Sequence, residues 1–182
     1  MSSKAPSSGE HKTYHNAYGQ RIEEFYINGK LEGERQIYNR DDQLLVHEFY
    51  SGGKKHGERK LWHENGRLKA HEFHRDNKAE GKCLEWYSNG NIRVCGVYRE
   101  DERNGILTRW RENGELSEKE FYLNGKRDGA RKVWSVRGIS YRYFSFRTWH
   151  HILRNKFRQR DFTKKFKILN PYLITDLVGL LA

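Results

Sequence analysis

Aromatic residues return along this chain at a constant interval of 24 residues. One column of this pattern holds Tyr14, Tyr38, Trp62, Trp86, Trp110 and Trp134, and a second holds Phe25, Phe49, Phe73, Val97 and Phe121. Glycines keep the same interval, at Gly33, Gly57, Gly81, Gly105 and Gly129. Self-similarity of this kind is the signature of a repeat protein, in which each unit packs on the next.

Each unit has the pattern of two short strands and two turns. Around Asn65-Gly66, strand-like residues precede the dipeptide at 58–63 and follow it at 68–74. Asn-Gly between strands is the strongest short signal for a β-hairpin, because both residues tolerate a positive φ. Glycine at this density disfavours helices. The pattern predicts an all-β repeat fold, an elongated, single-layer, twisted antiparallel meander of stacked β-hairpins.

The composition suits a thin structure rather than a thick core. Hydrophobic residues make up 35% of the chain and charged residues 32%, and the mean hydropathy is -1.05. Aromatic residues reach 14%, which argues against disorder. We expect the recurring aromatic residues to pack as a ladder that forms the core, and the Asp and Glu side chains to lie mostly in turns and on strand faces opposite Lys and Arg, as in a solvated sheet.

Two segments carry a specific motif of strand aromatics, an Asn-Gly-Lys turn and a following glycine, namely Phe25–Gly33 and Phe121–Gly129. The motif resembles the MORN repeat in its variant, YwqK-type form, which occurs in bacteria, eukaryotes and large DNA viruses. Asn77 and Asp101 stand where two units are expected to have the first turn glycine, and both residue types tolerate a left-handed backbone. The resemblance implies scaffold, membrane-associated or protein-binding roles rather than one chemistry.

The end of the chain departs from the repeat. The formal net charge is +11, and residues 131–182 hold 12 Lys and Arg against 2 Asp and Glu. The helical spacing of Trp149, Ile152, Leu153 and Phe157 predicts a short α-helical cap for the open sheet. The basic residues of this segment form a candidate surface for an anionic partner: Arg154, Lys156, Arg158, Arg160, Lys164, Lys165 and Lys167. We therefore predict a disordered tail over 1–12, hairpin repeats over 13–146 and a basic, partly helical segment over 147–182.

No catalytic or cofactor-binding motif is evident in the sequence. It contains no phosphate-binding G-x-x-x-x-G-K-[ST] motif. His71 and His74 alternate to opposite faces of one strand, so they make a poor metal pair. We expect no enzyme activity, no cofactor and no metal. Cys83 and Cys95 are expected to be free thiols, as in a reducing intracellular compartment. We expect an intracellular, cytoplasmic protein, with a membrane or a virion as alternative locations.

Three functions remain open from the sequence. The first is a non-enzymatic scaffold for a protein partner, because a thin repeat sheet exposes a long surface. The second is a peripheral membrane module that binds anionic phospholipids through the basic C-terminal segment. The third is nucleic-acid binding, with the aromatic column as a stacking platform.

Overall fold

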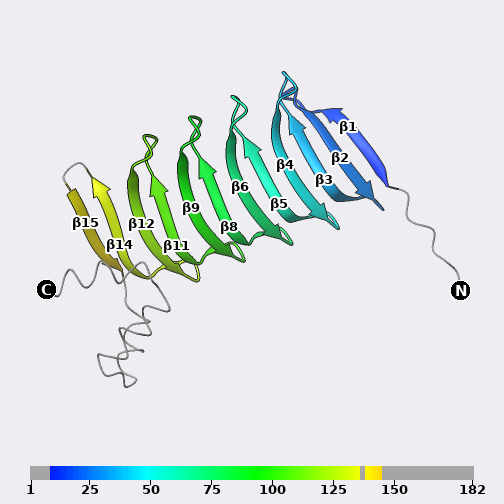
Figure 1. Cartoon of the computed structure of the whole chain (residues 1–182). Coiled ribbons are helices and arrows are strands. Elements are labelled where there is room, and N and C mark those ends of the chain that lie inside the picture. The colour runs from blue at the N-terminus through cyan, green and yellow to red at the C-terminus, as the bar shows by residue number, and fades with distance from the viewer. Residues whose placement is uncertain (1–8, 136–137, 145–182) are drawn as a thin grey trace, which may run out of the picture. The chain divides into compact units, whose positions relative to one another are not determined.

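The computed structural model describes residues 9–135 and 138–144, which form one 15-stranded antiparallel sheet (Figure 1). The long strands lie side by side in chain order, and the two-residue strands extend hairpin tips. The strands are β1 (Glu10–His15), β2 (Arg21–Ile27), β3 (Lys30–Tyr38), β4 (Leu44–Ser51), β5 (Lys54–Trp62), β6 (Leu68–Arg75), β7 (Lys78–Ala79), β8 (Gly81–Trp86), β9 (Ile92–Arg99), β10 (Glu102–Arg103), β11 (Gly105–Trp110), β12 (Leu116–Leu123), β13 (Lys126–Arg127), β14 (Gly129–Ser135) and β15 (Gly138–Phe144). The prediction of an all-β, open antiparallel meander of stacked hairpins is confirmed.

The sheet begins before the point that the sequence pattern predicts. Residues 10–12 belong to β1 rather than to a tail, because their backbone pairs with residues 24–26 of β2. The chain divides into one unit that ends at Phe144 and a second that starts at Ser145. The predicted α-helical cap lies outside the described residues. Within the described ranges, no helix is long and apolar enough to cross a membrane.

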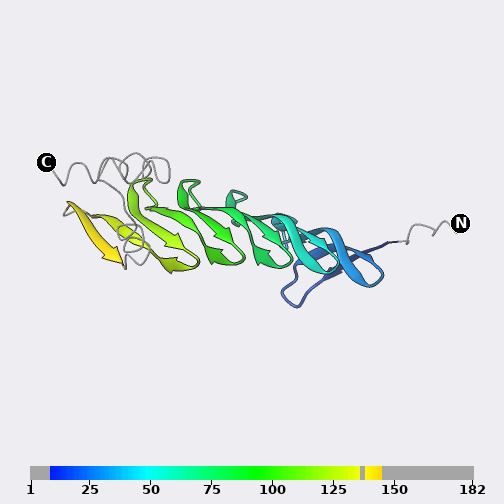
Figure 2. The same cartoon turned by 90° about the horizontal axis from the view of Figure 1, so that it is seen from below.

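A β-bulge recurs beside the same aromatic position in successive hairpins. The register shifts next to Tyr38, Trp62, Trp86 and Trp110. A bulge bends its strand and increases the local right-handed twist. The hairpins accordingly curve in the same sense along the sheet, as Figure 2 shows.

The first hairpin is shifted by one residue relative to the 24-residue repeat. Tyr14 therefore does not extend the aromatic column, contrary to the prediction. The turns that start at Asn16 and at Asn39 have the same hydrogen bonds, because each Asn Oδ1 accepts the N–H groups two and four residues later. These turns are 39 − 16 = 23 residues apart. Tyr14 therefore pairs with Ile22, and its hydroxyl donates to Glu24. A one-residue slip of this kind moves a side chain to the opposite face of a sheet.

Candidate functional site

The strand register gives the single-layer sheet two faces of different character. Residues paired across strands share a face, and successive residues along a strand lie on opposite faces. Glu48 pairs with Arg35 on one side and Arg59 on the other, so these side chains share a face, which we call the charged face. His47 and Phe49 flank Glu48 in the sequence and lie on the opposite face, which we call the aromatic face.

Carboxylates and guanidinium groups alternate across the charged face. Arg35 Nε donates to Glu24 at 2.6 Å, and its Nη1 donates to Glu48 at 2.9 Å. Arg59 repeats the arrangement, with Nε 3.0 Å from Glu48 and Nη1 2.9 Å from Glu72. The Glu48 residue is only 2% exposed. Each guanidinium thus bridges two strands, and the ladder ties β2 to β6.

The ionisation of this network is set by its internal hydrogen bonds. Burial by itself raises the pKa of Glu48, but hydrogen bonds from Tyr50 and Arg35 and the charge of Lys55 outweigh it and lower that pKa to about 2. Burial and the hydrogen bond to Glu48 raise the pKa of Tyr50 to about 12. At neutral pH the carboxylate is charged and the phenol is protonated. These pKa values favour a structural role over proton transfer, which needs a pKa near the working pH.

Three apolar or small residues interrupt the ladder in the middle of the charged face. Cys83, Gly96 and Leu107 occupy the next positions along the face, where continued alternation would place Arg, Glu and Arg. A Cβ atom on Gly96 would lie 2.8 Å from Leu107 Cδ1, so the glycine leaves room for the leucine. Burial raises the pKa of the Cys83 thiol to about 12, which makes the thiol a poor nucleophile. Cys95 is one step out of register with Cys83 and lies on the aromatic face, and both cysteines are free.

Ion pairs resume beyond this interruption. Arg109 Nη1 lies 2.7 Å from Glu118 and 3.0 Å from Glu120. Arg131 pairs with the same two carboxylates. The Tyr122 hydroxyl donates to Glu120 at 2.9 Å, as that of Tyr50 donates to Glu48. The expectation that carboxylates on the strands would be solvated is therefore wrong at three positions, where the residues are at most 5% exposed: Glu24, Glu48 and Glu120.

The recurring aromatic residues lie on the aromatic face and are half-buried rather than fully buried. The Tyr38 hydroxyl donates to Gln36 at 2.8 Å, and the Arg21 guanidinium lies 3.9 Å from the centre of the Tyr38 ring. Lys132 Nζ similarly lies 5.0 Å from the Trp134 ring centre. The buried apolar residues of the described chain, each at most 8% exposed, are instead on the charged face: Ile22, Ala70, Cys83, Leu107 and Tyr122. The prediction that the aromatic columns form the core is thus wrong in this respect.

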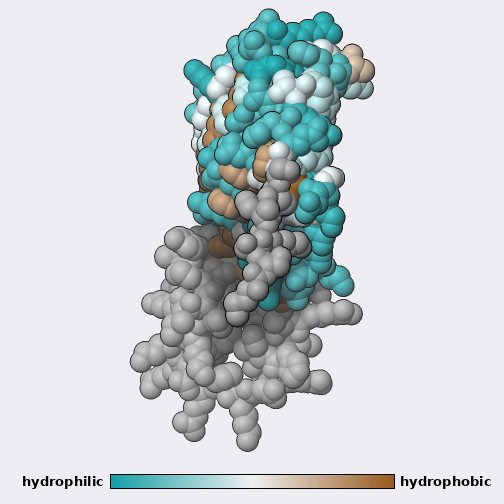
Figure 3. Space-filling model, turned by 90° about the vertical axis from the view of Figure 1, so that its right-hand side faces the viewer, coloured by the Kyte–Doolittle hydropathy of each residue, from teal (hydrophilic) through white to brown (hydrophobic). Residues whose placement is uncertain are grey.

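The phenylalanine column is most exposed in the middle of the aromatic face. Phe73 and Val97 are each 42% exposed, while Phe25, Phe49 and Phe121 are half-buried. Histidine rings lie against three of these side chains, with centroid distances of 4.6 Å for His11–Phe25, 4.9 Å for His47–Phe49 and 5.0 Å for His71–Phe73. In the space-filling view, apolar residues (brown) form a broken line among polar ones (teal) (Figure 3).

Side-chain contacts between consecutive turns are a feature that the sequence analysis missed. His63 Nε2 lies 3.0 Å from the carbonyl oxygen of Trp86, and the Tyr87 hydroxyl donates to the carbonyl oxygen of Trp110 at 2.8 Å. Arg111 makes the equivalent bond to Trp134. Because three different residue types perform the same task, no conserved column appears in the sequence. The buried glutamates, by contrast, do recur at the repeat interval and could have been found.

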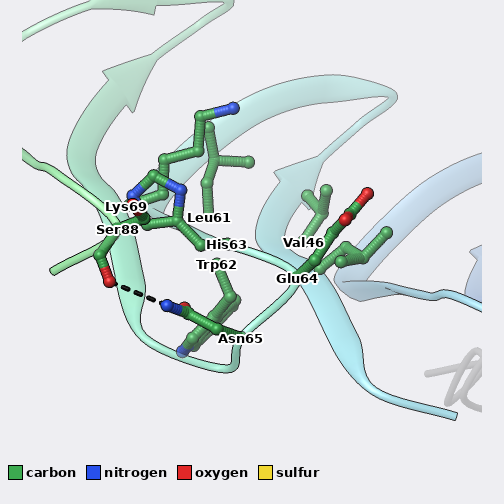
Figure 4. A pocket seen from close by; sticks show the side chains of 9 residues that line it. Val46, Leu61, Trp62, His63, Glu64, Asn65, Lys69 and Ser88 are labelled. Carbon is green, nitrogen blue, oxygen red and sulfur yellow. Dashed lines mark hydrogen bonds between the residues drawn. The ribbon is translucent and has the colours of Figure 1, made fainter. Parts of the chain in front are cut away.

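An open groove of about 580 Å³ lies beside the turn between β5 and β6 (Figure 4). Leu45, Leu61 and Trp62 contribute apolar surface, and Glu64 and Lys69 contribute charged groups. Leu45 occupies a bulge position that other units fill with Lys69, Arg93 or Ser117. This unit therefore combines the recurring aromatic ring with an extra apolar side chain, and the groove can accept an apolar side chain of a ligand.

The structure describes only some of the remaining predicted positions. The glycines Gly33, Gly57, Gly81, Gly105 and Gly129 all have positive φ, as turn or bulge positions require. The candidate anion-binding residues at 154–167 lie outside the described residues. Across residues 9–135 and 138–144, no group of three His, Cys, Asp or Glu side chains is placed to hold a metal ion.

These features define a β-hairpin repeat protein with an ion-paired face and an aromatic face. Its family is given by three consecutive segments, 55–76, 79–100 and 103–124, which match the model of the MORN repeat variant. The chain therefore carries MORN repeats of the variant type, which confirms the resemblance seen in its motifs. A search of curated proteins finds no significant match.

Proposed function

We propose that this chain is a non-enzymatic scaffold whose aromatic face binds another protein. The observation that carries the proposal is the 42% exposure of Phe73 and of Val97 at the middle of that face. Gathered apolar side chains favour association, because covering them removes apolar area from water. The charged face is a weaker candidate, since its carboxylates and guanidinium groups already satisfy one another.

The groove beside Trp62 offers a second place for a protein ligand, although its lining includes Leu61 of the charged face as well as Trp62 of the aromatic face. A protein ligand offers apolar side chains that fit between Leu45 and Trp62, and Glu64 and Lys69 supply charges that orient it. Pockets of this kind, which combine an aromatic anchor site with a polar rim, are typical centres of protein interfaces.

We also propose that the repeat extends beyond the matched segments. The 24-residue units then run from the turn at Asn39 to β15, and a helix around Trp149 and Phe157 caps the open end of the sheet. An uncovered edge strand invites association with other chains. Thermal melts of the full chain and of a chain that ends at residue 146 test the cap. A lower midpoint for the shorter chain supports it, and equal midpoints remove it.

A second candidate is binding of anionic phospholipid, which the concentration of Lys and Arg after residue 150 favours. Flotation with liposomes that contain or lack phosphoinositides tests it. Reversal of Lys164, Lys165 and Lys167 to Glu is expected to reduce flotation if these residues bind lipid. A salt-titrated gel shift with DNA and RNA tests nucleic-acid binding in the same variants.

The decisive experiment compares variants of the aromatic face with a matched control. Phe73→Asp/Val97→Asp places charge on the exposed apolar centre, whereas Tyr18→Asp changes an aromatic side chain that is 77% exposed in a turn. A protein partner should bind the parent and Tyr18→Asp equally well. Its affinity for the double variant should be at least about tenfold lower, as measured by calorimetry with the purified partner. Equal affinity for all three proteins would contradict the proposal.

A further inference from the structure

The aromatic face carries one row of side chains that crosses the sheet from strand to strand. The register pairs a member of the phenylalanine column with one residue of the preceding strand in each hairpin. These pairs are Glu34 with Phe49, Glu58 with Phe73, Lys82 with Val97, and Ile106 with Phe121. Because paired residues share a face, charged and apolar side chains alternate along the row from Glu34 to Val97, and Ile106 and Phe121 continue it as two apolar residues.

The charge in this row changes sign at Phe73 on β6. Glu58 lies on β5, one strand before β6, and Lys82 lies on β8, one strand after it. In the adjacent row, which passes through His71, Glu23 on β2 and Lys119 on β12 also carry opposite charges and are each four strands from β6, whereas Lys60 on β5 has Leu84 at the equivalent place on β8. Opposite charges thus stand at equal distances on the two sides of the most exposed apolar region.

This is the pattern that a two-fold symmetric contact requires. In such a contact the same surface meets itself, so residue i must complement residue j wherever j complements i. A two-fold axis that runs parallel to β6 through Phe73 places the Phe73 rings of two copies together. It places Glu58 of each copy opposite Lys82 of the other, and Phe49 opposite Val97.

We propose that the aromatic face binds a second copy of this chain, as an antiparallel face-to-face dimer with its axis at Phe73. The inference rests on the proposed function and names the partner of the same surface. Sheets that pack face to face are about 10 Å apart, a distance that phenylalanine and lysine side chains from both copies fill.

The contacts of Lys82 and Glu58 within one copy leave both groups able to pair with a second copy. Lys82 is exposed and forms no ion pair with the residues that the structure describes. Glu58 lies 2.7 Å from both Lys60 and His71, but a carboxylate accepts about four hydrogen bonds in total and retains capacity for another cation. Such pairs select the orientation of the two copies, while the apolar row supplies most of the affinity.

A polyanion fits the described sheet less well than a second copy does. Residues 1–130 hold 23 Lys and Arg against 22 Asp and Glu, so this part of the chain is almost neutral. A nucleic acid or an anionic membrane binds best to a surface with excess positive charge. Within the row, Glu58 before Phe73 and Lys82 after it are matched by the inverted copy of the same row.

The test is a charge swap in the full-length protein, followed by sedimentation velocity over about a hundredfold range of concentration. The parent is expected to show a monomer–dimer equilibrium. Glu58→Lys and Lys82→Glu should each weaken dimerisation about tenfold, because like charges then face each other twice per dimer. The double variant Glu58→Lys/Lys82→Glu should recover most of the parent affinity. Phe73→Asp, which opposes two carboxylates on the axis, should leave a monomer.

Controls separate this contact from other causes of association. Lys54→Glu, on a hairpin tip, should dimerise like the parent, as should reversal of Lys164, Lys165 and Lys167 to Glu. Circular dichroism melts verify that each variant folds. A parent that stays monomeric, or a dimer that is insensitive to the swap, overturns this inference. A monomeric parent that still captures a different protein, with loss in Phe73→Asp/Val97→Asp, overturns the inference alone and leaves the proposed function standing.

Discussion

Asn77 binds the backbone of Lys55 through two hydrogen bonds. The Asn77 N–H donates to the Lys55 carbonyl at 2.9 Å, and Asn77 Oδ1 accepts the Lys55 N–H at 2.8 Å. Asp101 makes the same pair of bonds to Ala79, whereas Gly53 makes the backbone bond alone, to Leu31. At the positions where the repeat pattern expects glycine, Asn and Asp therefore add a contact between consecutive hairpin tips.

Replacement of Asn77 should separate the two properties of this residue. Asn77→Gly keeps the positive φ, which is 71° here, and loses the side-chain bond, so we expect a loss of about 1 kcal/mol. Asn77→Ala loses the bond and also strains the left-handed backbone, for a total of about 2 kcal/mol. Urea unfolding measures both. Equal stability of Asn77→Gly and the parent would show that the side chain contributes nothing.

Gly96 and Leu107 should behave as a coupled pair. Gly96→Ala brings a methyl group within 2.8 Å of Leu107 Cδ1, so we expect a loss of about 1–3 kcal/mol from overpacking. Leu107→Ala alone should cost about 2–5 kcal/mol through the cavity. In the double variant the new methyl group partly fills that cavity, so its loss should be smaller than the sum of the single losses. Strict additivity in a thermodynamic cycle would contradict the coupling.

Acid should weaken the sheet through Glu48. Its pKa falls from 4.5 to about 2 on folding, so the contribution of the carboxylate is complete above pH 4.5 and disappears as the pH falls to about 2. We expect a decrease of up to about 3 kcal/mol in the free energy of unfolding over that range. Glu48→Gln should be less stable at neutral pH and should flatten this pH dependence.

The matched control for Glu48 is Glu64→Gln, in an exposed turn. It should follow the parent curve of unfolding free energy against pH. If Glu48→Gln retained the full acid sensitivity of the parent, the sensitivity would have to arise elsewhere.

The hydrogen bond between consecutive turns can be tested by removing one oxygen atom. Tyr87→Phe removes the hydroxyl that donates to the Trp110 carbonyl at 2.8 Å and leaves the ring in place. The expected loss is about 1 kcal/mol, seen as a lower urea midpoint with an unchanged slope. Tyr18→Phe, in an exposed turn, should have almost no effect. A loss of similar size in both variants would mean that the turn contact is not responsible.

The repeat sequence predicts the strands and turns well because both depend on local chemistry. Asn-Gly pairs and recurring glycines mark the turns wherever they occur, since the positive φ is a property of the residues themselves. The same reasoning failed for Tyr14, because the turns at Asn16 and Asn39 are one residue closer than the repeat interval, while Tyr14 and Tyr38 keep that interval. It also failed for Arg111, whose turn contact is made by a different residue type in each unit.

The chain by itself determined a β-hairpin meander, because the turn residues and the alternation along each strand are local properties of the sequence. Tertiary structure alone decided which face is closed to water. Neighbouring strands bring Arg35 and Arg59 against Glu48 from both sides, and the long guanidinium side chains and Tyr50 enclose the carboxylate. Phe73 on the opposite face, beside Glu58 and His71, is not enclosed in this way and stays 42% exposed. Burial in a single-layer sheet depends on the reach of cross-strand side chains, so hydrophobicity alone does not predict it.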